Sequence, residues 1–426
     1  MIRARAAALA RIALVLLCTL GADARAADPR PVVILLSWDG TRHDYPSRVA
    51  TVALARMARD GARAARLTPV FPSSTFPNHV SLATGTYADR HGIIENSFTD
   101  RRGGHFHYGN DASWIEAEPL WVAAERQDVR AAVFFWVGSE SDWKGRGATY
   151  RMRPFDPAIG EAAKVDQILS WLDLPADSRP GLIMSWWHGC DGVGHDKGPN
   201  APEIASQLLA QDRELARLFA GLDARRAWAY ATVIVASDHG MAEIKGMVDA
   251  ESALESAGIR ARVENSGGEG QVYLRDPAQR DAALAALAKV DGLQAYASER
   301  LPERLRSYFP GRSGDLTLLV APPNVLGRSS WRIRAGAAWR ALRGRGTGAH
   351  GFDPAQPDMG AIFYALGRGV PHGAELGEVR AVDVAPTVAA LLGIHPPEKS
   401  EGRALFSASQ VASKRSAQRG GAERRP

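Results

Sequence analysis

Short, continuous apolar runs recur along the chain, and polar, glycine-containing turns follow them. The first run, residues 31–37, reads Pro-Val-Val-Ile-Leu-Leu-Ser and leads directly into Trp-Asp-Gly. Because such a run lacks polar alternation, it is typical of a strand buried on both faces of a sheet. The same pattern predicts further buried strands at residues 131–137, 182–187, 232–236 and 361–365.

Segments with helical periodicity separate these predicted strands. The apolar spacing indicates helices at about residues 47–59, 120–126, 203–222 and 382–392. Strands that alternate with helices in this way predict an α/β fold, a three-layer core with a largely parallel central sheet. In such folds the ligand-binding residues gather beyond the carboxyl ends of the strands.

The middle of the chain has a different character. Between residues 247 and 344 the apolar runs weaken and Gly- and Pro-rich breaks are frequent, with strands expected at 271–274 and 316–320 and a helix at 280–290. We predict a smaller α/β insert or cap at residues 247–344, within a core formed by residues 27–246 and 345–406. Residues 407–426 are rich in Ser, Ala, Gly, Arg and Lys without periodicity, which predicts a disordered basic tail.

The first 26 residues have the pattern of a secretory signal peptide. Three arginines precede an apolar run at residues 12–20, and Ala24-Arg25-Ala26 forms a small-x-small cleavage signal. We therefore expect a periplasmic or secreted protein. Cys18 suggests a lipoprotein instead, but Leu17 before it is larger than that signal normally allows. No later segment has the roughly 20 apolar residues of a membrane-spanning helix, so no transmembrane segment is predicted.

Charge and cysteine content narrow the function classes. Removing residues 1–26 takes away four arginines and one aspartate, which lowers the formal net charge from +5 to about +2. A mature chain this close to neutral gives little support to a stable nucleic-acid partner. Only Cys190 remains after cleavage, so we expect no intramolecular disulfide.

The stretch at residues 69–79, Pro-Val-Phe-Pro-Ser-Ser-Thr-Phe-Pro-Asn-His, predicts a strand end, a tight turn and the start of a helix. Pro77 suits the first helical turn, because the amide hydrogen that it lacks would have no partner there. Thr75 would then lie at a helix N-terminus, where free amides and the helix dipole favour a phosphate or another tetrahedral anion. Taken alone, Thr75 is better explained as an ordinary helix cap.

Acidic and imidazole side chains follow several predicted strands or lie in glycine-rich loops beside them. Each pair alone is compatible with a helix cap and a surface histidine. Together they provide three aspartates and three histidines, an oxygen and nitrogen ligand set that suits zinc with open positions. The residues are Asp39, Asp191, His195, Asp238, His239 and His350.

The order of these motifs resembles that of a known family. The segments are Pro-Ser-Ser-Thr-Phe-Pro-Asn-His (72–79), His-Gly-Ile-Ile-Glu-Asn (91–96), Asp191-x-x-x-His195, Ser-Asp-His-Gly-Met (237–241) and His350-Gly351. In combination they resemble the nucleotide pyrophosphatase/phosphodiesterase (type I phosphodiesterase) family of the alkaline phosphatase superfamily. The resemblance extends from about residue 32 to residue 392, and it implies an alkaline-phosphatase-like core.

The resemblance also implies two zinc ions and a covalent intermediate. By motif position, Asp39, Asp238 and His239 would hold the ion that also contacts the Thr75 oxygen. Asp191, His195 and His350 would hold the other. Metal coordination would favour the alkoxide of Thr75, which would form a phosphothreonine ester that water then hydrolyses.

Three further residues match positions that contact the substrate in this family. Asn96 lies 21 residues after Thr75, where a neutral donor to a non-bridging phosphate oxygen is expected. Such a donor fits a phosphodiester better than a fully ionised monoester. Phe76 matches a ring that packs on a nucleobase, and Trp186 stands where an aromatic residue would lie on the other side of the base. Both aromatic residues are also compatible with a purely structural role in the core.

One departure from the family pattern bears on substrate choice. Where relatives commonly have Glu-Pro-Asp, this chain has Gly-Cys-Asp at residues 189–191, preceded by His188. The ligand is retained but its neighbours are not, and we expect His188 and Cys190 to be structural. The sequence thus predicts a two-zinc hydrolase of phosphodiester or pyrophosphate bonds in small nucleotide-type substrates. The alternatives are a related hydrolase of a phospholipid headgroup or other phosphate ester, a phosphonate hydrolase, and an inactive secreted binding protein.

Overall fold

The computed structural model describes residues 30–328 and 347–406, and an eight-stranded sheet forms its centre. The strand order is β19-β2-β18-β9-β1-β8-β6-β7. The expected signal peptide and basic tail lie outside the described residues. The strands are β1 (Val32–Trp38), β2 (Ala62–Arg63), β6 (Ala131–Phe134), β7 (Tyr150–Met152), β8 (Leu182–Trp187), β9 (Ala231–Ala236), β18 (Phe363–Gly367) and β19 (Ala374–Glu375).

The middle of this sheet is parallel. β1 pairs with β8 on one side and with β9 on the other, and β6 and β7 continue the parallel pairing beyond β8. β18 is antiparallel to β9, so the sheet is mixed at that side. The carboxyl ends of β1, β8 and β9 therefore meet at one edge, as the predicted α/β fold requires.

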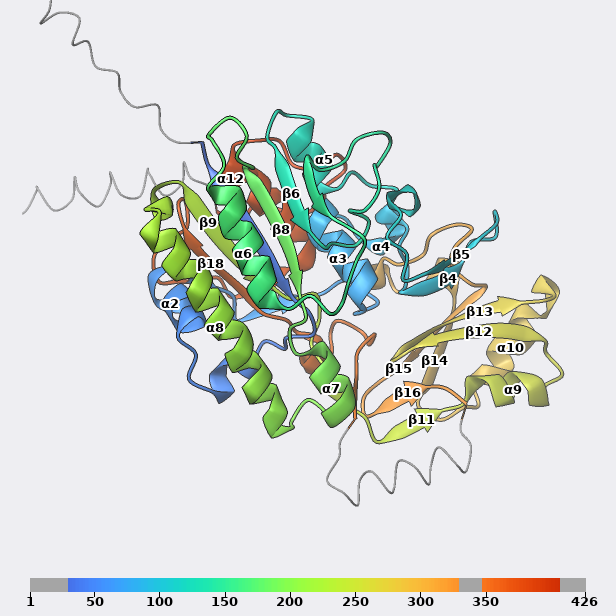
Figure 1. Ribbon diagram of the computed structural model, residues 1–426. Helices are drawn as coiled ribbons and strands as arrows, with labels where there is room; N and C mark the ends of the chain where they lie inside the picture. Colours follow the sequence, from blue (N-terminus) through green and yellow to red (C-terminus); the bar gives the residue numbers. More distant parts are fainter. Residues whose placement is uncertain (1–29, 329–346, 407–426) are drawn as a thin grey trace, which may run out of the picture. The chain divides into compact units, whose positions relative to one another are not determined.

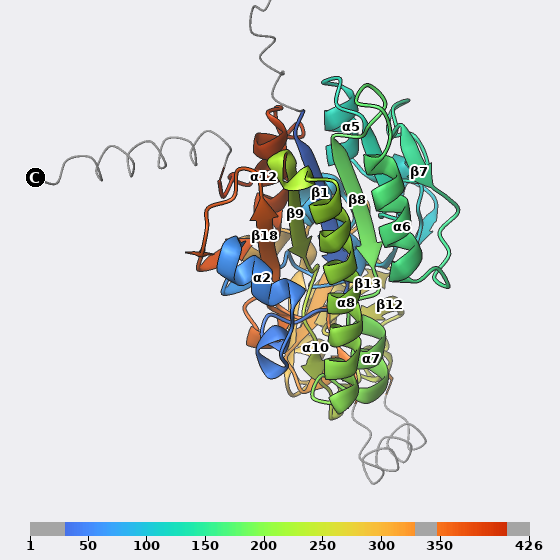
Figure 2. The ribbon, with the colours of Figure 1, turned by 60° about the vertical axis from the view of Figure 1, so that its left-hand side comes forward.

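Helices cover both faces of the sheet, which makes three layers (Figures 1 and 2). α6 and α8 lie side by side over one face together with α2, and α3, α5 and α12 cover the other. The helices are α2 (Ala53–Asp60), α3 (Thr75–Thr84), α4 (Ala88–His91), α5 (Leu120–Glu125), α6 (Glu161–Leu172), α7 (Asp191–Lys197), α8 (Pro202–Ala224) and α12 (Val384–Leu392).

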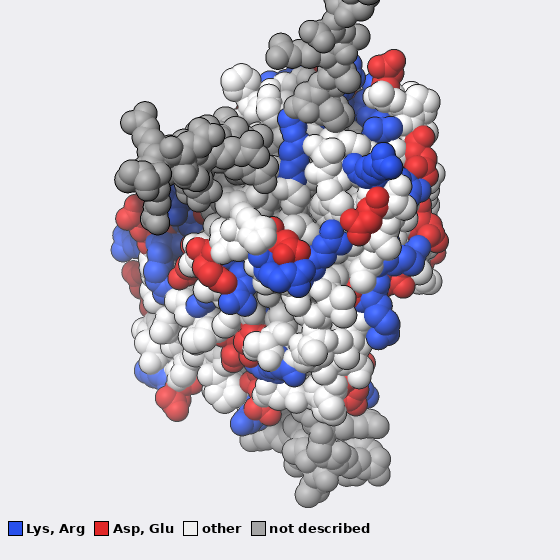
Figure 3. All heavy atoms as spheres, turned by 90° about the vertical axis from the view of Figure 1, so that its left-hand side faces the viewer, with Lys and Arg blue, Asp and Glu red and all other residues white. Residues whose placement is uncertain are grey.

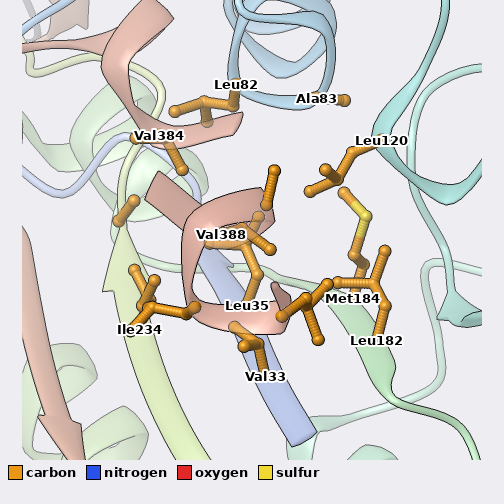
Figure 4. Packing of buried hydrophobic residues seen from close by; sticks show 14 of the residues in the cluster. Val33, Leu35, Leu82, Ala83, Leu120, Leu182, Met184, Ile234, Val384 and Val388 are labelled. Atoms are coloured by element: carbon orange, nitrogen blue, oxygen red, sulfur yellow. The ribbon is translucent and has the colours of Figure 1, made fainter. Parts of the chain in front are cut away.

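Alternate residues of β1 enter two different apolar clusters. Val33 and Leu35 pack with Leu82 of α3 and with Val384 and Val388 of α12 (Figure 4). The intervening residues of β1 join the cluster beneath α6 and α8. β1 is buried on both faces, as its uninterrupted apolar sequence predicts, and truncating one of its leucines to alanine would cost about 2–5 kcal/mol.

Residues 250–320 build a second, antiparallel sheet with strand order β12-β13-β15-β14 and an apolar cluster of its own. All described residues from Pro31 onward belong to one compact unit, so the division into core and insert stays a prediction. The elements are α9 (Ala250–Ser256), β12 (Ala261–Ser266), β13 (Glu269–Leu274), α10 (Arg280–Leu287), β14 (Leu293–Ala297) and β15 (Leu316–Val320).

Four short strand pairs connect loops around these two sheets. They are β3 (Arg66–Thr68) with β20 (Glu378–Arg380), β4 (Ser97–Thr99) with β5 (His105–His107), β10 (Ala242–Glu243) with β17 (Gly348–Ala349), and β11 (Gly246–Val248) with β16 (Asn324–Leu326).

Several predicted boundaries were wrong for identifiable reasons. The helix expected at residues 47–59 begins only at Ala53, because the carboxylate of Asp212 in α8 accepts the amides of residues 52–54 and caps it there. β6 ends at Phe134, since Phe135 adopts a left-handed conformation with φ 59°. Ala361 forms isolated bridges with Arg42 and Leu67, which moves the last strand to residues 363–367. Helix α6 was not predicted at all.

Basic and acidic side chains are interspersed on the face that Figure 3 shows, rather than gathered into areas of one sign. Within residues 30–328 and 347–406, no helix is both long enough and apolar enough to cross a membrane.

Candidate active site

Three aspartates follow neighbouring parallel strands at the same edge of the central sheet. Asp39 comes directly after β1, Asp238 comes two residues after the end of β9, and Asp191 begins the helix that follows β8. Because β1 pairs in register with both other strands, their carboxyl ends lie side by side. The sequence prediction of carboxylates that converge at strand ends therefore agrees with the topology.

Two glycines allow the turns after β1 and β8 to touch. Gly40 and Gly189 have positive φ values of 61° and 57°. A Cβ on Gly189 would lie 1.9 Å from the backbone oxygen of Asp39, and one on Gly40 would lie 2.7 Å from Cα of Asp191. A larger residue at either position would force the two aspartates apart.

Asp191 and His195 lie one turn apart on α7, a helix that was not predicted. Positions i and i+4 share one face of a helix. His195 Nε2 accordingly lies 3.3 Å from Asp191 Oδ1.

His350 follows β17, and its Nε2 lies 3.7 Å from Asp191 Oδ1. The turn between β12 and β13 holds this loop in place. The backbone oxygen of His350 accepts a hydrogen bond from the amide of Gly268 at 3.2 Å, and a Cβ on Gly267 would lie 1.9 Å from the same oxygen. The antiparallel sheet thus takes part in positioning a predicted ligand.

Thr75 is the first residue of α3, as predicted, and it is half-buried. Its hydroxyl lies 3.1 Å from His239 Nε2. Asn78 secures the preceding turn, because its side-chain nitrogen donates to the backbone oxygens of Pro72 and Ser74 at 2.9 Å each.

The three predicted histidine ligands share one orientation. Nδ1 donates to a backbone oxygen in each: Gly348 for His195 (2.9 Å), Gly240 for His239 (2.9 Å) and Ser73 for His350 (3.2 Å). A proton on Nδ1 leaves the lone pair of a neutral imidazole on Nε2. All three Nε2 atoms face the aspartates, an arrangement that is common around protein-bound metal ions.

The described residues form three overlapping groups whose possible ligand atoms lie within 4.8 Å of one another. One group is the set predicted for one ion. The set predicted for the other ion is split between the remaining two groups, which share Asp39, and one of these also contains a histidine that was not a predicted ligand. The groups are Asp191 with His195 and His350, Asp39 with Asp191 and His239, and Asp39 with His79 and Asp238. Asp238 Oδ2 also lies 3.2 Å from His239 Nε2.

The carboxylate oxygens at the centre of these groups are buried without hydrogen bonds. Asp39 Oδ1, Asp191 Oδ1 and Asp238 Oδ2 have no hydrogen-bond partner within the described part of the chain. Leaving such an atom unpaired is costly in a folded protein, and a bound cation would stabilise three such oxygens beside one another. The donor set of carboxylates and neutral imidazoles fits one or more divalent ions of the zinc type.

Electrostatics in the metal-free protein follow from burial and mutual repulsion. Burial, together with the charges of Asp238 and Asp191, raises the pKa of Asp39 well above its usual range. Burial acts to raise the pKa of Asp191 too, but the contact with His195 and the nearby His350 outweigh it and hold the pKa low. Burial lowers the pKa of His239 to about 4, so its imidazole is neutral at pH 7 and able to bind a metal.

A hydrogen bond to Phe76, the residue after Thr75, holds the Asn96 side chain beside the start of α3. Its side-chain oxygen accepts a hydrogen bond from the amide of Phe76 at 2.8 Å. That amide is one of the free donors expected at the N-terminus of α3, and its hydrogen bond to Asn96 occupies it. Asn96 is 5% exposed, and its hydrogen bond to the Phe76 amide identifies the oxygen end of the side chain, which leaves the NH₂ end as the donor.

A cavity of about 290 Å³ opens over Thr75 and the aspartates. Its polar floor includes Asp39, Asp191 and the hydroxyl-bearing Thr75. Its walls are mostly aromatic, and they include both predicted residues, Phe76 and Trp186. The aromatic wall consists of Phe76, Tyr108, Phe135, Trp136, Phe155 and Trp186.

Three residues of this region were not among the predicted catalytic, substrate-binding or metal-binding residues. His79 is one helical turn after Thr75, a spacing that signals a shared face; its Nδ1 donates to the Thr75 backbone oxygen at 2.8 Å and lies 3.3 Å from Asp238 Oδ2. Tyr108 and Phe155 are 55% and 41% exposed, which is unusual for large aromatic residues. Only the tertiary fold brings these two to the cavity, so no local pattern could have identified them.

The residues that replace the usual neighbours of Asp191 do not enter the ligand groups. Cys190 is buried, and its amide donates to the Asp39 backbone oxygen at 2.8 Å. His188 lies with Nδ1 2.7 Å from Glu161 Oε1, away from the aspartates' free oxygens. Both contacts are structural.

Comparison with known proteins places this architecture in a family. Residues 33–353 match the family model for type I phosphodiesterase / nucleotide pyrophosphatase. An uncharacterized pyrophosphatase/phosphodiesterase of Schizosaccharomyces pombe is 32% identical over 352 residues, which are 79% of this chain and 71% of that protein. Family member 1 of the ectonucleotide pyrophosphatase/phosphodiesterases of Homo sapiens is 27% identical over 86% of this chain. A venom phosphodiesterase of Crotalus durissus collilineatus is 28% identical over 85%.

The chain spans 40% of the length of the human protein and 44% of that of the venom enzyme. Among solved structures, murine ectonucleotide pyrophosphatase/phosphodiesterase 5, an inactive variant in complex with AMP, superposes with a TM-score of 0.77 at 23% identity, covering 86% of this chain and 96% of that one. The human counterpart also gives a TM-score of 0.77, at 24% identity and the same coverage. At these identities the superpositions establish a common fold, and the match to the family model establishes membership of the family. The chain is a member of the type I phosphodiesterase / nucleotide pyrophosphatase family.

Proposed function

We propose that this protein is a two-zinc hydrolase that cleaves phosphodiester or pyrophosphate bonds of small nucleotide-type substrates, with Thr75 as nucleophile. The observation that carries the proposal is the set of three unpaired, buried carboxylate oxygens, with Nε2 atoms facing them, beside the Thr75 hydroxyl. The family match to a type I phosphodiesterase / nucleotide pyrophosphatase supports the reaction class.

The ligand sets follow the motif positions. Asp39, Asp238 and His239 would hold one ion together with the Thr75 oxygen. Asp191, His195 and His350 would hold the other. Bound divalent ions would supply Lewis-acid stabilisation of the negative charge that develops on the attacking and leaving oxygens.

Thr75 Oγ would attack phosphorus in line with the leaving group. A P–O bond to the threonine forms, the bond from phosphorus to the leaving oxygen breaks, and that oxygen takes up a proton. Water then attacks phosphorus from the opposite side, the bond from phosphorus to Thr75 Oγ breaks, and Oγ regains a proton, so that the net reaction consumes one water per diester. The position of Thr75 at the start of α3 favours the negative charge of the phosphoryl group, because the helix dipole is positive at its N-terminus.

Asn96 would donate its side-chain NH₂ to a non-bridging oxygen of the transferring phosphoryl group. Its oxygen already accepts a hydrogen bond from the Phe76 amide, so the side-chain NH₂ is the group that can donate to the substrate. A preorganised neutral donor of this kind stabilises the single charge of a diester.

The aromatic wall would bind the base or another flat, apolar part of the substrate. Phe76 and Trp186 remain the predicted pair, and Tyr108 and Phe155 widen the same surface. The murine structural relative was solved in complex with AMP, which is a nucleotide, and this supports a nucleotide-type substrate here. The relatives named as ectonucleotide and venom enzymes likewise support an exported protein.

The test compares three aryl substrates in the zinc-reconstituted protein: an aryl nucleoside monophosphate diester, an aryl phosphate monoester and an aryl phosphonate. We expect the nucleoside diester to have the highest kcat/KM. A preference for the phosphonate or the monoester would instead favour a related hydrolase of a different ester.

The nucleophile is tested with Thr75→Ala, which should lower kcat by more than about a thousand-fold. Thr149→Ala, at an exposed threonine, serves as the matched control. Acid quenching followed by mass spectrometry should find a nucleotidyl adduct on the peptide that contains Thr75. Full activity in Thr75→Ala would show that another group attacks phosphorus.

A further inference from the structure

A buried lysine lies behind the wall of the cavity, and the proposed function gives it no role. Lys164 belongs to α6 and is 0% exposed. Its Nζ lies 4.6 Å from the centre of the Trp186 ring. In the described part of the chain, Nζ makes no hydrogen bond.

Burying an ammonium group without hydrogen bonds is costly, so Lys164 requires electrostatic compensation. Its ion-pair partner, Glu161 Oε1, lies 3.8 Å away. That oxygen also accepts the amide of His188 at 2.9 Å and lies 2.7 Å from His188 Nδ1. Because Glu161 is shared, the face of the Trp186 ring is an important part of the environment of the lysine charge.

The N–H edge of the same indole reaches the candidate metal centre. Trp186 Nε1 donates to Asp39 Oδ2 at 2.9 Å. The second oxygen of this carboxylate, Oδ1, is the one without a hydrogen-bond partner among the described residues, and it lies 3.7 Å from His239 Nε2. The indole therefore fixes the rotation of the Asp39 carboxylate and leaves one oxygen directed toward the other ligands.

We propose that Trp186, polarised by Lys164, is a positioning residue for Asp39 in the metal centre. A cation over the ring draws π density away from the indole nitrogen, which makes its N–H a stronger donor to the carboxylate. Lys164 acts only through the indole. The inference rests on the proposed function, because it takes Asp39 to be a metal ligand.

The experiment titrates Zn²⁺ into metal-stripped full-length protein in competition with a chromophoric chelator. Trp186→Phe keeps an aromatic ring but removes the N–H. Lys164→Met keeps an unbranched stem but removes the charge. Lys144→Met is the matched control, because its Nζ lies 4.3 Å from the Trp143 ring, whose Nε1 donates to the backbone of Ile115 and not to a metal ligand.

Trp186→Phe should lower the affinity for one of the two zinc ions by about 10–100-fold and leave the affinity for the other unchanged. Lys164→Met should lower the affinity for the same ion by a smaller factor, about three- to ten-fold. The double variant, with both substitutions, should have the same zinc affinity as Trp186→Phe alone. Lys144→Met should bind both ions as the parent does. A Lys164→Met effect that persists in full in the Trp186→Phe background would overturn the relay through the indole.

A second readout does not depend on metal binding. In indole N–H spectra of the metal-free protein, the signal of Trp186 is the one among 11 tryptophans that Trp186→Phe removes. The signal should lie downfield, as expected for a hydrogen bond to a carboxyl oxygen, and move upfield in Lys164→Met but not in Lys144→Met. An unchanged Trp186 signal in a folded Lys164→Met variant would refute polarisation by the lysine.

The outcomes separate this inference from the proposed function. If the parent protein binds two zinc ions and Trp186→Phe binds them equally tightly, the positioning role is wrong and the metal centre stands. If the parent protein binds no zinc, the proposed metal centre fails, and the positioning role fails with it.

Discussion

The backbone oxygen of Asp39 accepts a hydrogen bond from the amide of Asp191 at 3.2 Å. Two predicted ligands from separate strands are thereby joined through their main chains before any metal binds. The contact depends on the close approach of two turns, and only glycine at positions 40 and 189 permits it.

Gly189→Ala should therefore destabilise the fold and impair zinc binding together. The added Cβ would lie 1.9 Å from the Asp39 backbone oxygen at a residue with φ 57°. We expect a loss of about 2–5 kcal/mol in the free energy of unfolding, measured by denaturant titration. Gly145→Ala is the control, because that residue also has a positive φ but has nothing within 4 Å of its Cβ. Equal losses in both variants would mean that backbone strain, not the contact, matters.

Asp238→Asn should stabilise the metal-free protein while weakening its zinc binding. Burial raises the pKa of Asp238, so the folded state binds a proton more tightly than the unfolded state does. That contribution to stability is present below the unfolded pKa and is lost as the pH rises through the folded one. Thermal unfolding should therefore show a larger gain for Asp238→Asn at pH 8 than at pH 5, on the order of 1–2 kcal/mol at pH 8. A variant less stable than the parent at pH 8 would contradict this electrostatic account.

Zinc affinity of the parent protein should fall as the pH falls. Burial and the neighbouring carboxylates raise the pKa of Asp39, and burial raises that of Asp238, so metal binding must displace protons. Competition titrations between pH 8 and pH 6 should show progressive weakening, by up to about tenfold per pH unit for each proton displaced. An affinity that does not change over this range would place the metal on other groups.

Asn96→Asp separates the structural bond of this side chain from its proposed donor role. The substituted carboxylate can still accept the Phe76 amide, but it presents an oxygen where the NH₂ stood. We expect kcat for a nucleoside diester to fall by about 10²–10³, with unchanged thermal stability. A variant that unfolds, or one that retains full activity, would contradict the assignment of a donor.

Phe155→Ala and Tyr108→Ala should reduce kcat/KM for an aryl nucleoside diester but not for methyl aryl phosphate, which lacks a base. Both residues line the cavity and expose much of their rings, so each loss removes apolar contact area from a bound base. An effect of about five- to fifty-fold is expected. Tyr308→Ala, at an exposed aromatic outside the cavity lining, is the control. Equal losses with both substrates would show that these rings do not contact the base.

The sequence predicted most strands of the central sheet because burial on both faces leaves an unbroken apolar run, as in β1 and β8. It failed where tertiary contacts set a boundary. The carboxylate of Asp212, far along the chain, decides where α2 begins. The left-handed conformation of Phe135 ends β6 early, and no composition rule indicates this for a phenylalanine.

In the candidate site, too, some residues could be predicted from local motifs and others are placed only by the tertiary fold. The predicted ligands occur in short motifs at strand ends, and the topology brings them together. Phe155 and Tyr108 belong to segments without periodicity, and they reach the cavity only through the packing of distant loops. The bond from Trp186 to Asp39 likewise depends on the register between β8 and β1, which the sequence does not specify.

Anomalous diffraction from crystals of the zinc-reconstituted protein, recorded on both sides of the zinc absorption edge, tests the central claim most directly. The account predicts two peaks, one bounded by Asp39, Asp238, His239 and the Thr75 hydroxyl, the other by Asp191, His195 and His350. A single peak, or zinc bound away from these seven side chains, would contradict it.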